Sequence, residues 1–264
     1  MSKIWIAGCL VLSAGLVQAQ QKEGKVMYER VSQMQAHLNI NGQETVMPQS
    51  RKDNFELTFG NNQSLWKAAE QENNDDNAAG GDGVQIHMIV AGSNDVLYTN
   101  FETGKRTEKR EFLDKTFIID DSVHPLKWKM TGETKTILNL SCMKATATSI
   151  SARMTMNIDN GKMERKEIQD TAMITAGFTT GIPVSAGPAE YQGQLPGLIL
   201  EMDVNNGRQA FKATGITAKA DLSIIKEPTG KKHYTPEEFK KERDKMMEEM
   251  QRNNQGGNRQ IRIN

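Results

Sequence analysis

The stretch YQGQLPGLILEMDVNNG, residues 191–207, sets the expected fold of this chain. Pro196 cannot donate a hydrogen bond to a strand ladder, so it marks the beginning of a strand, and Gly197 permits a tight backbone. After this turn apolar and polar side chains alternate, as in a strand with one buried face. The set expected to face the core is Leu198, Leu200, Met202 and Val204. We therefore interpret Leu195, Pro196 and Gly197 as a turn that starts a buried strand. The stretch offers no nucleophile, general base or set of metal ligands.

Alternating apolar segments separated by turn signals recur along the chain, for example in residues 54–59, 83–90 and 154–168. Strands joined by short turns pair antiparallel, because parallel pairs need long crossovers. The pattern predicts a mainly antiparallel β fold, either sandwich-like or an open half-barrel. Hairpin turns are expected at Asn41-Gly42, Thr103-Gly104, Asn160-Gly161 and Asn206-Gly207. Two further strands within residues 126–147 are expected to meet near Gly132 and Glu133.

The N-terminus has the pattern of a secretory signal peptide. Lys3 precedes an apolar run from Ile4 to Val17, which is too short to span a membrane, and a small-residue cleavage site ends at Ala19. Cys9 lies in a sequence similar to a lipobox, but the apolar run continues beyond it, so cleavage after Ala19 is the preferred interpretation. The mature protein is thus expected in the periplasm or outside the cell, without a membrane span.

The rest of the chain divides by composition. We expect a signal peptide at 1–19, an antiparallel β domain at 20–230, a C-terminal helix at 231–252 and a disordered tail at 253–264. Thr235 is the expected N-cap of the helix, Pro236 its first residue and Glu238 the partner in a capping box. The polar segment 70–83 is interpreted as a mobile loop.

Charge and cysteine content exclude several classes of protein. Lysine plus arginine equals aspartate plus glutamate, 33 each, so no overall charge attracts nucleic acid. Cys142 is the only cysteine left after signal cleavage, so no internal disulfide is expected and the thiol is interpreted as a small buried apolar group. The four histidines have no metal-ligand spacing, and we expect no metal, no cofactor and no catalytic residues.

Aromatic residues are the remaining candidates for a binding site. Most such residues fill a core. If the sheet forms an incomplete barrel, however, Trp128, Phe178 and Tyr191 could line a concave apolar pocket. They are therefore the speculative pocket walls.

The segment QLPGLILEMDV, with Leu195, Pro196, Gly197, Leu198 and Ile199, resembles the signature of the GLPGLI family, which comprises secreted Bacteroidetes proteins of unknown function. Similarity to the family extends to residues 24–29, 127–147 and 176–200. Gln194 replaces the first glycine of the signature, and Gly193 is expected to supply that backbone freedom one position earlier. The resemblance implies an envelope protein without established catalytic residues, and an association with outer-membrane receptor systems.

Together these features favour a non-catalytic binding or carrier module for a lipid, a peptide or a partner. The alternative is an interaction or structural protein that is accessory to outer-membrane receptor systems and uses an edge strand or the C-terminal helix as its contact.

Overall fold

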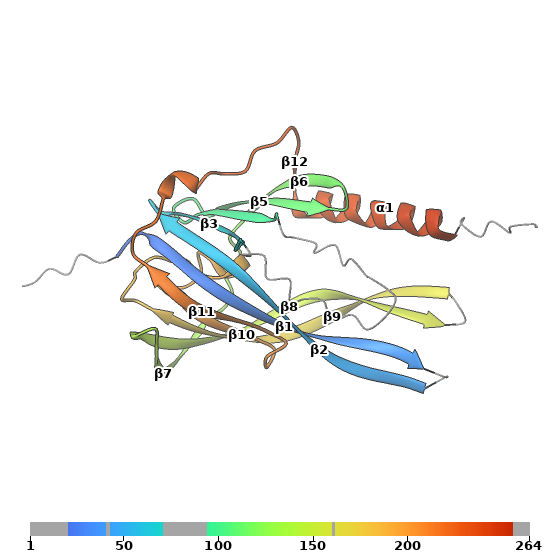
Figure 1. Ribbon diagram of the computed structural model, residues 1–264, viewed down its shortest axis with the longest axis horizontal. Coiled ribbons are helices and arrows are strands. Elements are labelled where there is room, and N and C mark those ends of the chain that lie inside the picture. Colours follow the sequence, from blue (N-terminus) through green and yellow to red (C-terminus); the bar gives the residue numbers. More distant parts are fainter. Residues whose placement is uncertain (1–20, 41–42, 71–93, 160–161, 256–264) are drawn as a thin grey trace, which may run out of the picture.

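The computed structural model describes residues 21–40, 43–70, 94–159 and 162–255, which form one twelve-stranded sheet and one α-helix (Figure 1). The strand order is β12-β6-β5-β4-β3-β2-β1-β11-β10-β9-β8-β7. All neighbours are antiparallel except β12, which runs parallel to β6. The strands are β1 (Gly24–Ile40), β2 (Gln43–Gly60), β3 (Gln63–Ala68), β4 (Val96–Asn100), β5 (Lys105–Phe112), β6 (Lys115–Ser122), β7 (Lys129–Ile137), β8 (Leu140–Asp159), β9 (Lys162–Thr179), β10 (Leu198–Val204), β11 (Gln209–Thr217) and β12 (His233–Tyr234).

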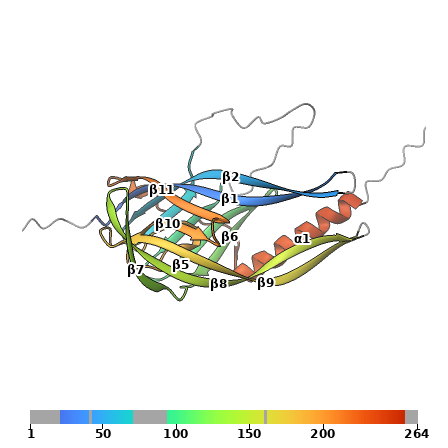
Figure 2. The same ribbon diagram turned by 90° about the horizontal axis from the view of Figure 1, so that it is seen from below.

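The sheet is strongly curved and open (Figures 1 and 2). Its edge strands, β7 and β12, lie at opposite ends of the strand order and do not pair with each other. The prediction of a mainly antiparallel β fold is confirmed, and the single sheet corresponds to the open half-barrel rather than to a sandwich of two sheets. The long hairpins β1–β2 and β8–β9 and the helix α1 (Pro236–Gln255) extend toward the same end of the molecule.

The strand pairing confirms the expected hairpins. Pairing reaches Ile40–Gln43 and Asp159–Lys162 on either side of two predicted turns, and short loops follow β4 and β10 at the other two. The expected turn near Gly132 and Glu133 is wrong. Both residues lie within β7, where the pairing with β8 is interrupted between Met130 and Thr134.

The turn between β7 and β8 is formed instead by Leu138 and Asn139, which both have positive φ, 47° and 63°. Asparagine tolerates this left-handed conformation, so a two-residue turn closes there. The predicted strand at 83–90 lies outside the described residues, as do the signal peptide, nearly all of the loop at 70–83 and most of the tail.

A loop between β9 and β10, residues 180–197, covers part of the concave side of the sheet. We call this side the inner face; it carries Val26, Leu57, Phe211 and Met202, all of them buried. Ile182, Ala186, Tyr191 and Leu195 of the loop belong to the same hydrophobic cluster. The backbone N–H groups of Leu198 and Ile199 donate to the carbonyls of Ile182 and Ala186 at 3.1 and 3.0 Å, which fixes the loop against the start of β10.

A smaller cluster forms where α1 covers the inner face of β6. It contains Phe117 and Ile119 of β6 and Phe239 and Met246 of α1, and the rings of Phe117 and Phe239 pack edge to face with centroids 5.1 Å apart. The expected capping box is present: Thr235 N–H donates to Glu238 at 2.9 Å, and Glu238 N–H donates to the Thr235 hydroxyl at 3.2 Å. The helix begins at Pro236 rather than at 231, because His233 and Tyr234 pair with β6 as β12.

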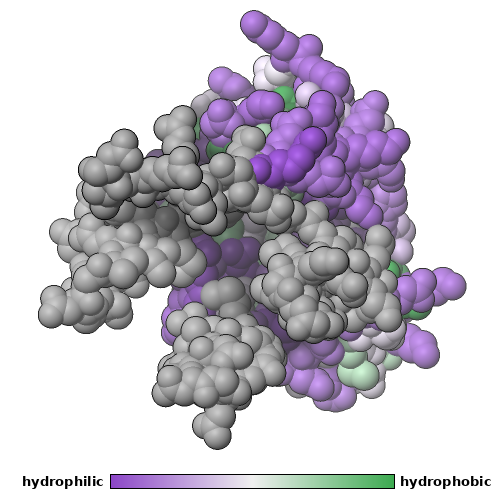
Figure 3. All heavy atoms as spheres, turned by 90° about the vertical axis from the view of Figure 1, so that its right-hand side faces the viewer, coloured by the Kyte–Doolittle hydropathy of each residue, from purple (hydrophilic) through white to green (hydrophobic). Residues whose placement is uncertain are grey.

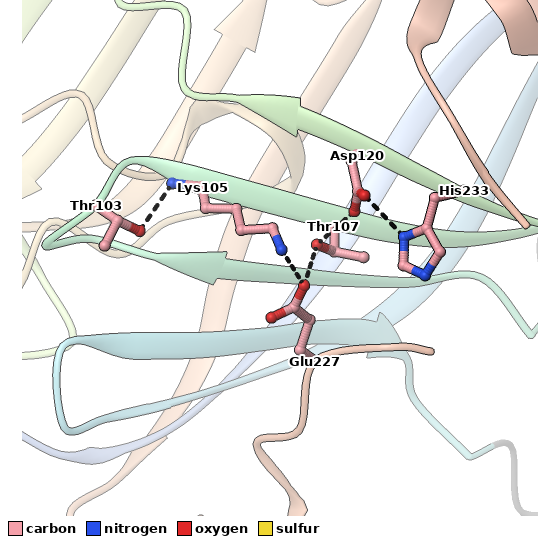
Figure 4. A network of polar contacts seen from close by, with 6 residues as sticks. All are labelled: Thr103, Lys105, Thr107, Asp120, Glu227 and His233. Atoms are coloured by element: carbon pink, nitrogen blue, oxygen red, sulfur yellow. Dashed lines mark hydrogen bonds and ion pairs between the residues drawn. The ribbon is translucent and has the colours of Figure 1, made fainter. Parts of the chain in front are cut away.

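A polar network holds the segment before α1 on the opposite, outer face (Figure 4). Glu227 pairs with Lys105 at 2.5 Å and lies 2.9 Å from the hydroxyl of Thr107. That hydroxyl is 3.1 Å from Asp120, which also pairs with Nδ1 of His233 at 2.7 Å. The chain therefore passes over the outer face of β5 and β6, turns around the sheet edge, and places α1 on the inner face.

Among the described residues, no helix has the length and apolar character needed to cross a membrane. Seen from the end toward which α1 extends, the described surface is largely hydrophilic with small separate apolar areas (Figure 3).

Candidate functional site

The three aromatic residues singled out as pocket walls all lie in or against the main core. Phe178 of β9 is fully buried, Tyr191 is 7% exposed, and Trp128 is half-buried and packs against the same cluster. The structure therefore brings them into one hydrophobic cluster between the loop 180–197 and the inner face. They do not line the three cavities described below, and contact between them and a ligand stays a prediction.

The turn Leu195–Pro196–Gly197 anchors this loop. Leu195, Leu198 and Ile199 are almost completely buried, whereas Pro196 is exposed. A Cβ atom at position 197 would collide with the backbone carbonyl of Thr179. Glycine is required there because two backbone segments touch, which is an architectural role.

Gln194, which departs from the family signature, joins the segment before β7 to the loop 180–197. Its side-chain oxygen accepts hydrogen bonds from the backbone N–H of Leu126 at 3.0 Å and from Nε1 of Trp128 at 3.1 Å. Its side-chain nitrogen donates to the carbonyl of Glu190 at 3.1 Å. The preceding Gly193 has φ +77°, so it supplies the left-handed backbone expected at this position.

Two further polar contacts tie the start of β10 and the loop to the strands of the inner face. The Tyr28 hydroxyl donates to the carbonyl of Ile199 at 2.5 Å, and burial raises the pKa of Tyr28, which keeps the hydroxyl protonated as a donor. The buried side chain of Gln192 accepts a hydrogen bond from Ser64 of β3. The loop is thus a fixed part of the core.

A cleft remains on the inner face between this loop and α1. It consists of two adjoining cavities of about 360 and 250 Å³. Leu97 of β4 and Arg106, Glu108 and Arg110 of β5 line both cavities, so the two lie side by side. We refer to this space as the inner cleft.

Strand alternation explains why these residues share the inner cleft. Arg106, Glu108 and Arg110 occupy every second position of β5 and therefore point to one side. Glu108 is paired with Leu97 on β4 and with Ile119 on β6, and Ile119 packs under α1. The intervening positions, including Lys105 and Thr107, point to the outer face, where they form the network of Figure 4.

One wall of the inner cleft is aromatic. The rings of Phe55 and Trp66 stack with centroids 4.8 Å apart and an interplanar angle of 11°. The guanidinium carbon of Arg30 lies 4.6 Å from the centroid of Phe55, in cation–π contact. At the other end, the guanidinium of Arg110 lies 5.3 Å from the ring of Phe239 on α1.

The carboxylates of the inner cleft are partly neutralised. Glu108 accepts hydrogen bonds from Nε and Nη2 of Arg110 at 2.8 and 2.5 Å, yet burial outweighs this contact and raises the pKa of Glu108. Burial also raises the pKa of Asp95, whose carboxylate accepts a hydrogen bond from Glu111 N–H at 2.8 Å. Glu190 lies at the exposed mouth of the cleft.

A third cavity, of about 490 Å³, lies on the outer face beside β7. Its lining combines Lys135 and Lys144 with acidic side chains, and Lys135 pairs with Glu201 while Lys144 pairs with Glu133. The lysines of this cavity are therefore already paired with carboxylates of the protein. For this reason the inner cleft is the stronger candidate for ligand binding.

Within the described part of the chain, no group of three or more histidine, cysteine or acidic residues is arranged to hold a metal ion. His124 and His233 each contact one aspartate, Asp121 and Asp120, at 2.9 and 2.7 Å. Among the described residues, none that lines the inner cleft carries a hydroxyl, thiol or imidazole, and its acidic side chains are Asp95, Glu108, Asp121 and Glu190. The inner cleft thus offers guanidinium donors, carboxylates and apolar surface.

Sequence reasoning did not identify the polar residues of the inner cleft. In residues 105–112, KRTEKREF, charged side chains occupy both faces of the strand, so nothing in the pattern separates Arg106 and Arg110 from solvent-exposed charges. Trp66 was one aromatic residue among several. Only the covering by α1 and the loop turns these residues into a site.

Part of the chain matches a known protein family. Residues 128–201 match a family described as "Protein of unknown function (Porph_ging)". No curated protein matches the chain. A solved structure described as "Structure of PNGF-II in C2 space group" aligns with 17% identity and a TM-score of 0.44, over 84% of this chain and 32% of that one. The segment that contains the Leu195–Ile199 turn is therefore similar to a family of unknown function.

Proposed function

We propose that this protein is a non-catalytic binding module of the bacterial envelope that holds its ligand in the inner cleft. The signal peptide expected at 1–19 supports a periplasmic or secreted location, and the match over residues 128–201 is compatible with membership of the GLPGLI family.

The observation that carries the proposal is the position of the inner cleft. The loop 180–197 fills one part of the concave face with buried apolar side chains, but the space between Glu190 and Phe239 is lined by both guanidinium groups and aromatic rings. Ligand sites are typically concave and mostly apolar, with a few fixed polar groups that orient the ligand. The inner cleft is concave and has fixed polar groups, and charged and apolar side chains share its lining about equally, which suits a ligand with both a polar and an apolar part.

The test is mass spectrometry of an organic extract from the mature protein, purified from its native envelope without detergent. A stoichiometric small molecule in the wild-type extract is expected. It should be lost in Glu190→Trp, because a large side chain at the exposed mouth would narrow the cleft. Glu102→Trp, which alters an exposed turn away from the cleft, is the matched control and should keep the molecule. A clean wild-type extract, or retention by Glu190→Trp, would count against the proposal.

A second candidate is an interaction protein accessory to outer-membrane receptor systems. The edge strand β7 favours it, since eight of its nine residues are exposed and one side of the strand has no neighbour in the described sheet. The helix α1 is a weaker contact for a partner, because Phe239 and Met246 already pack on β6. Cross-linking in the envelope with a photoreactive residue at Thr131 should capture a partner if this candidate is correct, and a residue at Glu102 serves as the control.

A further inference from the structure

We infer that the ligand of the inner cleft is an amphipathic anion, with a carboxylate or phosphate group seated between Arg30 and Arg106 and an apolar body against the aromatic wall. This inference rests on the proposed binding function and adds the chemical class of the ligand.

The two arginines have donors that the protein leaves unused. Nε of Arg30 and Nε of Arg106 are buried and have no hydrogen-bond partner among the described residues. Both residues line the larger cavity of the inner cleft. Buried polar groups are almost always hydrogen-bonded, and an unmet donor on a charged group is costly, so both guanidinium groups keep hydrogen-bonding capacity beside the cavity.

The charge on Arg106 is also weakly compensated. Its side chain is only 13% exposed, and the carboxylate of Asp121 is 3.9 Å from its Nη1, which is too far for a hydrogen bond. Asp121 in turn lies 2.9 Å from His124. By contrast, Arg110 bonds twice to Glu108, so Arg106 is the guanidinium with capacity for a further anion.

Arg30 is held in place by its neighbours, but one N–H donor of its guanidinium has no acceptor among the described residues. Its Nη2 donates to Asp53 at 2.8 Å, but Asp53 is shared with Arg51, which contacts its other oxygen at 2.8 Å. The stack on Phe55 fixes the plane of the guanidinium. A rigid planar fork of this kind matches the geometry of carboxylate and phosphate oxygens.

The acidic residues that line the inner cleft do not reverse its preference for an anionic ligand. The carboxylate of Glu108 accepts hydrogen bonds from Arg110, and that of Asp95 accepts one from the backbone N–H of Glu111, so both already have partners within the protein. At the far end Asp121 lines the cavity together with Lys240 and Arg243, and Arg243 pairs with Asp244 at 2.9 Å. Over the whole cleft five basic side chains face four acidic ones, so the balance of charge favours an anion over a cation by one charge.

The apolar body of the ligand is inferred from what flanks the arginines. On one side are Phe55 and Trp66, and on the other are Leu97, Ile119 and Phe239. Each cavity is small, about 360 and 250 Å³, which fits a molecule with one charged group and a short apolar or flat portion.

The experiment is calorimetric titration of the mature protein with four probes that share a ten-carbon chain: decanoate, decyl phosphate, decanol and decyltrimethylammonium. Inorganic phosphate and acetate test the anionic group without an apolar body. We expect decanoate or decyl phosphate to bind at least about 10-fold more tightly than decanol, the scale of one charge-assisted hydrogen bond. The cation should not bind. The stronger of the two anions identifies the head group.

Arg106→Gln should weaken binding of the anionic probes by about 10- to 100-fold and leave decanol unchanged. Arg30→Gln provides a second variant if Arg106→Gln does not fold, and Arg208→Gln, which removes an exposed ion pair with Asp170, is the matched control. Equal affinity for decanol and the anions would overturn the inference while leaving the binding function intact. If none of the probes binds, the inference also fails, and the extract experiment with Glu190→Trp then decides the binding function separately.

Discussion

The indole nitrogen of Trp128 donates a hydrogen bond of 3.1 Å to the side-chain oxygen of Gln194, across 66 residues of sequence. The same oxygen accepts the backbone N–H of Leu126, so one glutamine side chain holds the segment before β7 against the loop that fills the sheet. This contact joins the two ends of the region that matches the family of unknown function.

Gln194→Ala is expected to destabilise the protein by about 1–3 kcal/mol, because it leaves two partly buried donors without their acceptor. The measurement is the urea midpoint of unfolding, followed by tryptophan fluorescence. Lys127→Ala, at an exposed neighbouring position, should leave the midpoint unchanged. An unchanged midpoint in Gln194→Ala would show that water replaces these hydrogen bonds without cost.

Gly197→Ala is expected to destabilise the protein by more than about 2 kcal/mol, because the added methyl group would collide with the Thr179 carbonyl and the backbone on both sides is buried. Gly215→Ala is the matched control, since a Cβ atom at that position meets no other atom within 4 Å. Thermal unfolding of both variants tests this. Equal melting temperatures would contradict the close approach of the two backbone segments.

The thiol of Cys142 is expected to be unreactive in the native protein. It is fully buried, and burial raises its pKa, so the reactive thiolate is scarce and inaccessible. Titration with a thiol-specific chromogenic reagent should report no thiol in the mature native protein and one after denaturation in urea. Ser141→Cys, at an exposed neighbouring position, should add one thiol that reacts at once. Rapid native reaction of the wild-type protein would contradict this prediction.

Glu108 is expected to make the stability of the protein depend on pH. Burial raises its pKa in the folded state, so the folded protein retains this proton at pH values where the unfolded chain has released it. The free energy of unfolding therefore loses this contribution as pH rises from the ordinary carboxyl range through the raised pKa.

In Glu108→Gln this contribution is absent. The free energy of unfolding of the variant, minus that of the wild type, should increase as the pH rises from the ordinary carboxyl range through the raised pKa of Glu108. Urea unfolding at several pH values measures this difference. Glu227 titrates in both proteins, so its effect cancels, whereas Asp95 raises the pKa of Glu108 and is therefore replaced by Asn in both proteins being compared. A difference that stays constant with pH would show that Glu108 is not desolvated.

The local features of this fold were accessible from sequence because they depend on neighbouring residues. Alternation after Gly197 predicted the buried face of β10, asparagine–glycine pairs predicted hairpins, and Thr235 with Glu238 predicted the cap of α1. The turn was wrongly predicted near Gly132 because a glycine in the sequence can mark either a turn or an interruption of strand pairing, and here it marks the interruption within β7.

The sequence by itself determined an antiparallel β protein with a turn at Leu195–Gly197 before a buried strand, and with a C-terminal helix. The strands follow from the alternation of apolar side chains, the turn from the backbone freedom of glycine, and the start of the helix from its capping residues. Only the tertiary structure decided that the sheet stays open, that the loop 180–197 fills part of its inner face, and that α1 covers another part. The inner cleft lies between those two covers. Its residues come from strands that are far apart in the chain. A charged side chain becomes buried with an unsatisfied hydrogen-bond donor only when distant segments of the chain remove it from water.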